Sequence, residues 1–209
     1  MAAADDLVPR TTARGGRSPT VETVAVVVAV FLLQVPLTAL GLLGLFVLDP
    51  AFVVKPWTLL TATYAHAGPG HLVGNLVPLL LFGFAVERVT TRWRYHAFFV
   101  VTGALAGLAE VVLGGLVSLS ATGVLGASGA VFALMGYAVT GNDAAGWALE
   151  ALDSVTDSEW AVTTVLVALA VVVAVALSGP GSALIAHLVG FLLGLGAGRL
   201  RLLHVDRRE

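Results

Sequence analysis

Six long apolar runs, separated by short polar connections, are the dominant pattern of this 209-residue chain. A helix of about 20 apolar residues crosses the hydrocarbon core of a bilayer, and each run approaches or exceeds that length. The pattern therefore predicts an all-α membrane protein with six transmembrane helices. We expect these helices at about residues 24–48, 72–86, 95 into the 110s, 123–140, 160–177 and 183–203.

The remaining segments are polar and set the domain organisation. Residues 1–20 contain proline, glycine and three arginines, which predicts a disordered tail. The run at 24–48 is too long to be the apolar region of a cleaved signal peptide. Residues 141–159 form a polar connection between two runs. We expect one membrane domain over residues 21–205, flanked by the tail at 1–20 and a short one at 206–209.

Composition supports the membrane assignment and narrows the chemistry. The chain is 58% hydrophobic and 11% charged, whereas soluble domains are roughly 45–50% apolar and about 25% charged. It contains no cysteine, which excludes disulfides, thiolate catalysis and cysteine-ligated metals. The net charge of −2 provides no basic excess for nucleic acid. We expect the lipid bilayer as a partner, and no nucleic acid.

Lysine and arginine are distributed unevenly between the two sides. If the N-terminus is cytoplasmic, ten of the eleven basic residues fall on the cytoplasmic side and only Lys55 on the other. The ten are Arg10, Arg14, Arg17, Arg88, Arg92, Arg94, Arg199, Arg201, Arg207 and Arg208. Basic residues favour the cytoplasmic side of a membrane. We therefore expect a multi-pass protein of the cell membrane with both termini in the cytoplasm.

Polar side chains from three predicted helices meet at one level under this topology. His66 and His71 lie at the outer start of the second run, and Asn75 follows one turn deeper. Ser128 and His187 lie about one to two turns below the outer ends of the fourth and sixth runs. Hydrocarbon offers no hydrogen-bond partners to such groups. Their shared depth therefore indicates a common functional site.

Acyl transfer is the chemistry that uses this set of side chains. A serine hydroxyl such as that of Ser128 becomes an effective nucleophile when a neighbouring histidine accepts its proton, and His187 is the candidate base. His71, Asn75 and the backbone N–H of Ser128 could donate hydrogen bonds to the oxyanion that follows. No carboxylate is placed as a third member, so the sequence predicts a Ser–His dyad.

Small residues make the required helix packing plausible. Gly126, Gly129 and Gly136 surround Ser128, and glycines follow His187 at 190, 194 and 198. Small residues at such spacings let two helix backbones approach closely. We expect the fourth and sixth helices to bring Ser128 within hydrogen-bond reach of His187.

The residues that carry this pattern are, in chain order, Trp57, His66, His71, Asn75, Gly126, Ser128, Gly129, Ala186, His187, Gly190 and Gly194. In order and spacing they resemble the signature of the rhomboid intramembrane serine proteases, over about residues 55–200. The resemblance implies a rhomboid-like six-helix bundle. It also implies a serine endopeptidase that cleaves transmembrane protein substrates near the outer membrane face, with no metal or other cofactor.

The resemblance also assigns roles to single residues. It makes Ser128 the nucleophile and His187 the general base, with His71, Asn75 and the Ser128 amide at the oxyanion. His66 becomes a nearby structural or hydrogen-bonding residue. The other supporting residues are Trp57, Gly126, Gly129, Phe132 and Gly190. The connection at 178–182 matches the flexible segment that caps the active site in this family.

Two positions depart from the family pattern. Thr58 follows Trp57 where many members have arginine, so the contacts of that arginine must be replaced or lost. Phe132 stands four residues after Ser128, where many members have a tyrosine that stacks on the histidine. The Phe132 ring could still stack, without a hydroxyl.

Other interpretations of these residues stay open at this point. Trp57 could be an interfacial anchor. His66 and His71 could bind a metal, although no His-Glu-x-x-His spacing occurs. A non-catalytic rhomboid-like protein that binds membrane clients is the main alternative, and a small transporter using Ser128, His187 and Glu110 is another. Glu110 is ambiguous, because an ionisable group in a membrane span is a functional candidate. No feature of the sequence specifies an oligomeric state.

Overall fold

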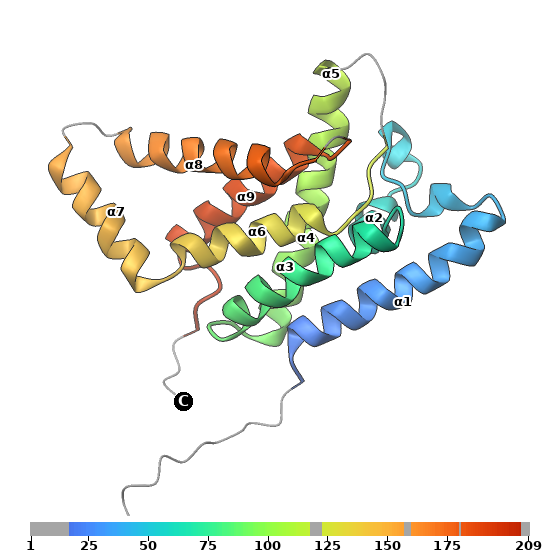
Figure 1. The fold of residues 1–209 in the computed structure, drawn as a ribbon, viewed down its shortest axis with the longest axis horizontal. Coiled ribbons are helices and arrows are strands. Elements are labelled where there is room, and N and C mark those ends of the chain that lie inside the picture. The colour runs from blue at the N-terminus through green and yellow to red at the C-terminus, as the bar shows by residue number, and fades with distance from the viewer. Residues whose placement is uncertain (1–16, 118–122, 157–159, 180, 206–209) are drawn as a thin grey trace, which may run out of the picture.

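The fold of the protein was obtained as a computed structural model that describes residues 17–117, 123–156, 160–179 and 181–205. Within these residues the chain is helical and contains no strand beyond one isolated bridge (Figure 1). The elements are α1 (Pro19–Ala39), η1 (Leu43–Leu45), η2 (Pro50–Val53), α2 (Thr58–Tyr64), α3 (Pro69–Glu87), α4 (Arg92–Ala109), the π-helical η3 (Glu110–Gly114), α5 (Gly115–Val117), α6 (Ser128–Thr140), α7 (Asp143–Val155), α8 (Ala161–Leu177) and α9 (Leu184–Arg199). The predicted all-α membrane bundle is confirmed.

Three of these helices are long and apolar enough to cross a membrane by length and composition: α1, α3 and the continuous stretch Arg92–Gly114. The helices α6, α8 and α9 are also apolar but shorter, with 13, 17 and 16 residues. At a rise of about 1.5 Å per residue, α6 is roughly 20 Å long, whereas the hydrocarbon core is about 30 Å thick. The count of six spanning helices therefore stays a prediction.

The distribution of side chains is that of a membrane protein, with many large apolar residues exposed and several polar residues buried. Large apolar side chains of α1 and α8 are exposed, among them Leu32, Leu33, Val172 and Val175. Buried polar residues include Gln34, Thr63, His66, Asn75, Thr102, Thr140 and His187. An exposed apolar surface is favourable only where lipid replaces water, so these faces are suited to a bilayer.

Several element boundaries differ from the sequence prediction. Residues 1–16 and 206–209 lie outside the described residues, but Pro19 and Thr20 are helical, so the predicted tail at 1–20 is wrong at its end. The Ser18 hydroxyl accepts the Val21 N–H at 3.3 Å, and Pro19 occupies the first turn, where its missing N–H costs nothing. Two connections also contain helices that were not predicted, α2 and α7.

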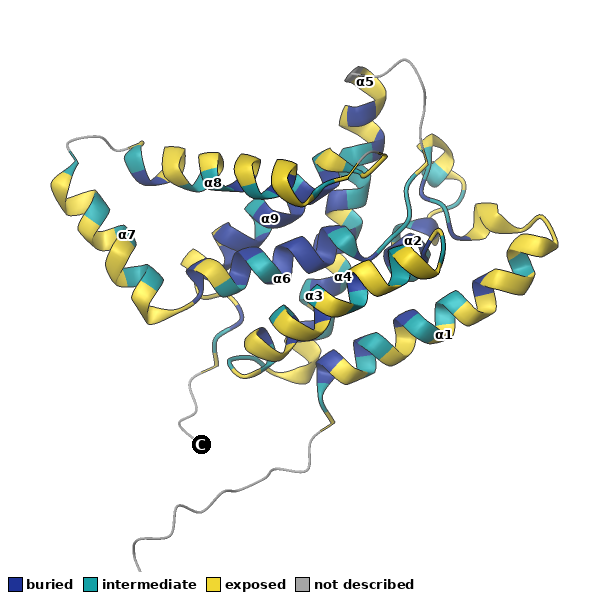
Figure 2. Ribbon diagram, viewed as in Figure 1, coloured by how far each residue is buried: buried dark blue, intermediate teal, exposed yellow. Residues whose placement is uncertain are grey.

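The centre of the bundle is α6, whose residues are mostly buried (Figure 2). It packs against α9 through backbone contacts at glycines. A Cβ atom at Gly190 would overlap the carbonyl oxygen of Gly129, and one at Gly194 would overlap that of Ala133. The close approach expected from the small residues is therefore present.

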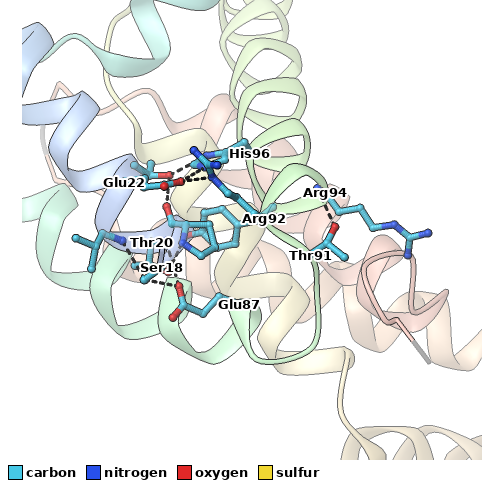
Figure 3. Close-up of polar contacts among 12 residues, drawn as sticks. Ser18, Thr20, Glu22, Glu87, Thr91, Arg92, Arg94 and His96 are labelled. Atoms are coloured by element: carbon cyan, nitrogen blue, oxygen red, sulfur yellow. Dashed lines mark hydrogen bonds and ion pairs between the residues drawn. The ribbon is translucent and has the colours of Figure 1, made fainter. Parts of the chain in front are cut away.

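The ends of α1, α3 and α4 are tied together by a polar cluster (Figure 3). The Glu22 carboxylate accepts hydrogen bonds from Arg92 Nε at 2.7 Å and His96 Nε2 at 2.9 Å. Glu87, at the end of α3, accepts one from the Ser18 hydroxyl at 2.7 Å. Arg94 donates to the carbonyl of His204, beyond α9, at 3.1 Å. Arg92 and Arg94, both in the first turn of α4, thus lie at the end of the bundle opposite the start of α3.

We predict that Gly194→Ala lowers the free energy of unfolding by roughly 1–3 kcal/mol, because the added methyl group must push α9 away from α6. Gly196 lies on the same helix, with nothing within 4 Å of its Cβ position. Gly196→Ala is therefore the matched control, and it should be neutral or stabilising by up to about 1 kcal/mol. Thermal unfolding of the detergent-solubilised variants measures the difference. Equal transition temperatures would contradict the glycine-mediated contact.

Candidate active site

The starts of α3, α6 and α9 line an open cavity of about 700 Å³. The polar residues that line it include His71 and Asn75 from α3, Ser128 from α6 and His187 from α9. Phe132 lines the same space. The structure thus brings together the four side chains for which the sequence predicts a common level.

Ser128 is the first residue of α6, whereas the sequence prediction places it inside a helix that begins near residue 123. The preceding chain is not helical, because Val124 pairs antiparallel with Leu48 through hydrogen bonds of 2.8 and 2.9 Å. Gly126 then donates its N–H to the Ala62 carbonyl at 2.8 Å. As a result, the N–H of Ser128 lies in a first helical turn, where no intrahelical carbonyl is available and the helix dipole is positive.

Gly126 cannot carry a side chain here. Its φ of +138° is a conformation that residues with a Cβ rarely adopt. A Cβ atom would also lie 2.8 Å from His71 Cε1 and 3.9 Å from Ser128 Oγ. The His71 ring therefore packs directly on the Gly126 backbone, next to the Ser128 hydroxyl.

The hydrogen bonds of His71 indicate which ring nitrogen carries the proton. The Ala67 N–H donates to His71 Nδ1 at 3.3 Å, so Nδ1 is an acceptor and the neutral ring is protonated at Nε2. Nε2 is the nitrogen that lies 2.9 Å from the Cβ position of Gly126, on the Ser128 side. Asn75 donates one N–H to the His71 carbonyl at 3.0 Å, which leaves its second amide hydrogen for a ligand.

The His187 ring is held on one face and at one nitrogen. Phe132 stacks on it with ring centroids 4.3 Å apart and planes 7° apart, as the sequence comparison anticipated. His187 Nδ1 forms a 2.6 Å hydrogen bond with the hydroxyl of Ser178. No hydrogen bond joins Ser128 and His187, both of which are described, so the expected contact is not made in this structure. His187 Nε2 has no hydrogen-bond partner among the described residues.

Glu110 lies beside the start of α9. Its Oε2 accepts the backbone N–H of Ala186, the residue before His187, at 2.9 Å. The carboxylate therefore satisfies one of the free N–H groups in the first turn of α9. Glu110 begins the π-helical turn at the end of α4, a kind of irregularity that is frequent at functional sites. Its presence in an apolar run signals a partner, but a backbone partner is invisible in the sequence.

His66 is buried beside the site, with 1% of its surface exposed. Its ring lies edge-on to that of His71, with centroids 5.1 Å apart. Its backbone is clamped by Gln34 of α1, whose amide accepts the His66 N–H and donates to the His66 carbonyl, both at 3.0 Å. Sequence reasoning missed Gln34, although an amide in an apolar run was the available signal. In the described part of the chain, no third metal-ligating side chain joins His66 and His71.

Trp57 lies outside the cavity and is 47% exposed at the start of α2. The Thr58 hydroxyl, buried beside it, donates to the Lys55 carbonyl at 2.7 Å. Lys55 also pairs with Asp49 at 2.7 Å, and this hydrogen bond holds the pKa of the Asp49 carboxyl below its usual value. The loop before α2, which lacks the arginine of the family pattern, is therefore held by hydrogen bonds among its own residues.

Helical packing around a half-buried serine, two histidines and an amide defines this chain as a multi-pass membrane protein with a polar internal site. The sequence matches the Rhomboid domain family over residues 54–204, and the chain belongs to the rhomboid family. It is also similar to Rhomboid-related protein 2 of Mus musculus, with 37% identity over 83 residues. That match covers 39% of this chain and 26% of the relative.

We predict that Glu110→Ala lowers stability by roughly 1–3 kcal/mol, because it leaves the Ala186 N–H without its acceptor inside the bundle. Glu110→Gln retains a carbonyl oxygen at the same place and should lose less than half as much. Thermal unfolding in detergent compares the two variants with the unaltered protein. Equal losses in both variants would show that the charge, and not the hydrogen bond to α9, determines the effect.

Proposed function

We propose that this protein is an intramembrane serine endopeptidase in which Ser128 is the nucleophile and His187 the general base. The cavity that gathers Ser128, His187, His71 and Asn75 from three separate helices carries the proposal. A single serine or histidine in a membrane helix is commonly explained by packing. A nucleophile, a base and two hydrogen-bond donors around one cavity match the needs of acyl transfer.

The reaction proceeds in two steps. His187 Nε2 accepts the hydroxyl proton as Ser128 Oγ attacks the substrate carbonyl, and the imidazolium then protonates the departing amine. A water molecule hydrolyses the acyl-enzyme by the same route, with His187 again as the base. The distance between Ser128 and His187 must shorten when substrate binds, as is common for catalytic hydrogen bonds that are loose without substrate.

Several groups can donate hydrogen bonds to the oxyanion of the tetrahedral intermediate. These are the backbone N–H of Ser128, the Nε2–H of His71 and the second amide hydrogen of Asn75. The positive end of the α6 dipole adds to their effect. Because Ala67 and the His71 carbonyl already hold the two side chains, little reorganisation is needed during reaction.

The substrates that we propose are transmembrane proteins. The cavity lies at the end of the bundle opposite Arg92 and Arg94, and the positive-inside rule assigns these arginines to the cytoplasm together with both termini. Cleavage would then occur near the outer face. A helical substrate must expose an extended peptide to Ser128, which favours segments with small residues and weak helices.

Ser128→Ala and His187→Ala should each abolish cleavage of a model transmembrane substrate by the purified protein in detergent. Loss of a serine nucleophile can lower turnover by about 10⁶-fold, below detection in such an assay. Labelling by a fluorophosphonate should disappear in Ser128→Ala. Ser154→Ala is the control, because the Ser154 hydroxyl on α7 bonds only to its own helix at the Ala151 carbonyl.

Cleavage that persists in Ser128→Ala would refute the proposed nucleophile. A wild-type protein that binds membrane clients without cleaving them would instead favour the non-catalytic rhomboid-like alternative. A strong effect of Glu110→Gln on transport, with a mild effect of Ser128→Ala, would favour a transporter.

Asn75→Asp and His71→Ala should each reduce kcat by roughly 10²–10³-fold, the usual cost of losing one oxyanion donor. Asn75→Asp preserves the shape of the side chain but removes its N–H groups, so KM should change little. Steady-state kinetics with a fluorogenic transmembrane substrate separates the two constants. A rise in KM at constant kcat would assign these residues to substrate binding instead.

A further inference from the structure

Ser178 is a residue of the site that the sequence analysis did not identify. It follows α8 directly, in an extended conformation with φ −98° and ψ 129°. Its hydroxyl lies 2.6 Å from Nδ1 of His187, nine residues further along the chain. This contact goes beyond a Ser–His dyad, because it provides the base with a partner on its far side.

A histidine that acts as general base needs such a partner. When it accepts a proton at Nε2, both ring nitrogens carry hydrogen, and the Nδ1–H requires an acceptor. Neither carboxylate that the sequence places in the core helices meets this need. Glu110 is bonded to the Ala186 N–H, and Glu87 is bonded to Ser18 and Thr20 at the opposite end of the bundle.

The two contacts of the His187 ring constrain different motions. Stacking on Phe132 fixes the plane of the ring, but a flip of the ring about its Cβ–Cγ bond keeps that plane and exchanges Nδ1 with Cδ2. The hydrogen bond from Nδ1 to Ser178 excludes the flipped ring and so fixes the position of Nε2. Phe132 and Ser178 together therefore define the orientation of the base.

We propose that Ser178 is a positioning residue of the catalytic centre, whose hydroxyl oxygen accepts the Nδ1–H of His187 and stabilises the imidazolium formed during acyl transfer. The inference rests on the proposed function. The proposed centre contains two serines on either side of one histidine. Ser128 reacts with the substrate, and Ser178 orients the His187 ring.

The connection between α8 and α9 holds Ser178 in place. Ser182 folds back on this connection, since its N–H donates to the Gly179 carbonyl at 3.1 Å and its hydroxyl accepts the Gly179 N–H at 3.0 Å. Ser182 also lines the cavity, but its hydroxyl bonds within the connection and not to His187. Ser182 thus helps to hold the connection, whereas Ser154 on α7 bonds only to its own helix at the Ala151 carbonyl and provides the control.

Few other titratable groups face His187. His71 lies across the cavity on α3, and Glu110 reaches the neighbouring Ala186 N–H from the end of α4. The helix α8 contains no titratable residue, and Tyr137 of α6 is bonded to His204 beyond the far end of α9. A change in pH dependence after substitution of Ser178 can therefore be attributed to His187 if the same change is absent in the control.

The test compares the unaltered protein with Ser178→Ala, Ser178→Thr, Ser154→Ala and Ser128→Ala in cleavage of one transmembrane substrate across a range of pH. We expect Ser178→Ala to lower kcat about ten- to a hundredfold at unchanged KM, the usual effect of one hydrogen bond to a charged group. The acid limb of its kcat/KM profile should move to lower pH, because protonated His187 loses an acceptor. Ser178→Thr should restore both quantities.

The inference is overturned if Ser178→Ala retains the wild-type kcat and pH profile, if only KM changes, or if Ser154→Ala has the same effect. Each of these results leaves the proposed protease intact as long as Ser128→Ala is inactive. Cleavage by Ser128→Ala, or none by the wild type, would instead refute the proposed function and the inference with it.

Discussion

The close backbone contact between α6 and α9 is the constraint on which the site depends. Ser128 begins one of these helices and His187 lies in the first turns of the other, so the distance between the helices sets the distance between the two side chains. Gly190 and Gly194 leave no space for a Cβ atom at the contact. Lipid provides no hydrophobic force that would drive two apolar helices together. Close packing and hydrogen bonds such as that from the Thr140 hydroxyl to the Leu195 carbonyl, at 2.8 Å, must hold them.

The polar groups of the site are held mainly by hydrogen bonds between side chains and the backbone. Gln34 clamps the chain at His66, the Ala67 N–H orients His71, and Glu110 caps the turn before His187. An unsatisfied polar group inside a bilayer costs several kcal/mol. These hydrogen bonds therefore satisfy polar groups for which lipid offers no partner, and they also fix the geometry of the site. In a catalytic centre, donors that are fixed before the reaction need no reorganisation when charge develops.

The sequence was most informative where an apolar run carried a polar residue. Each helix that was predicted from an apolar run is present, and Ser128, His187, His71 and Asn75 line one cavity as expected. The start of α6 at Ser128 was not predictable, because it depends on the pairing of Val124 with Leu48, more than 70 residues earlier in the chain. The partner of Glu110 was missed for a related reason, since a backbone N–H has no signature in the sequence. Ser178 was missed because it lies in a loop, where a serine is unremarkable in composition.

The choice of a hydroxyl beside His187 follows from the cost of charge in this environment. A carboxylate at Nδ1 would stabilise the imidazolium more strongly, but burying it next to a neutral histidine carries a desolvation penalty of several kcal/mol. A hydroxyl accepts the same hydrogen bond without bringing a charge into the membrane. The carboxylate of Glu110 is used instead at the N-terminus of α9, where the helix dipole and the Ala186 N–H compensate its charge. In the proposed protease, the hydrogen bond to Ser178 thus supports His187 at a lower electrostatic cost than a buried carboxylate would.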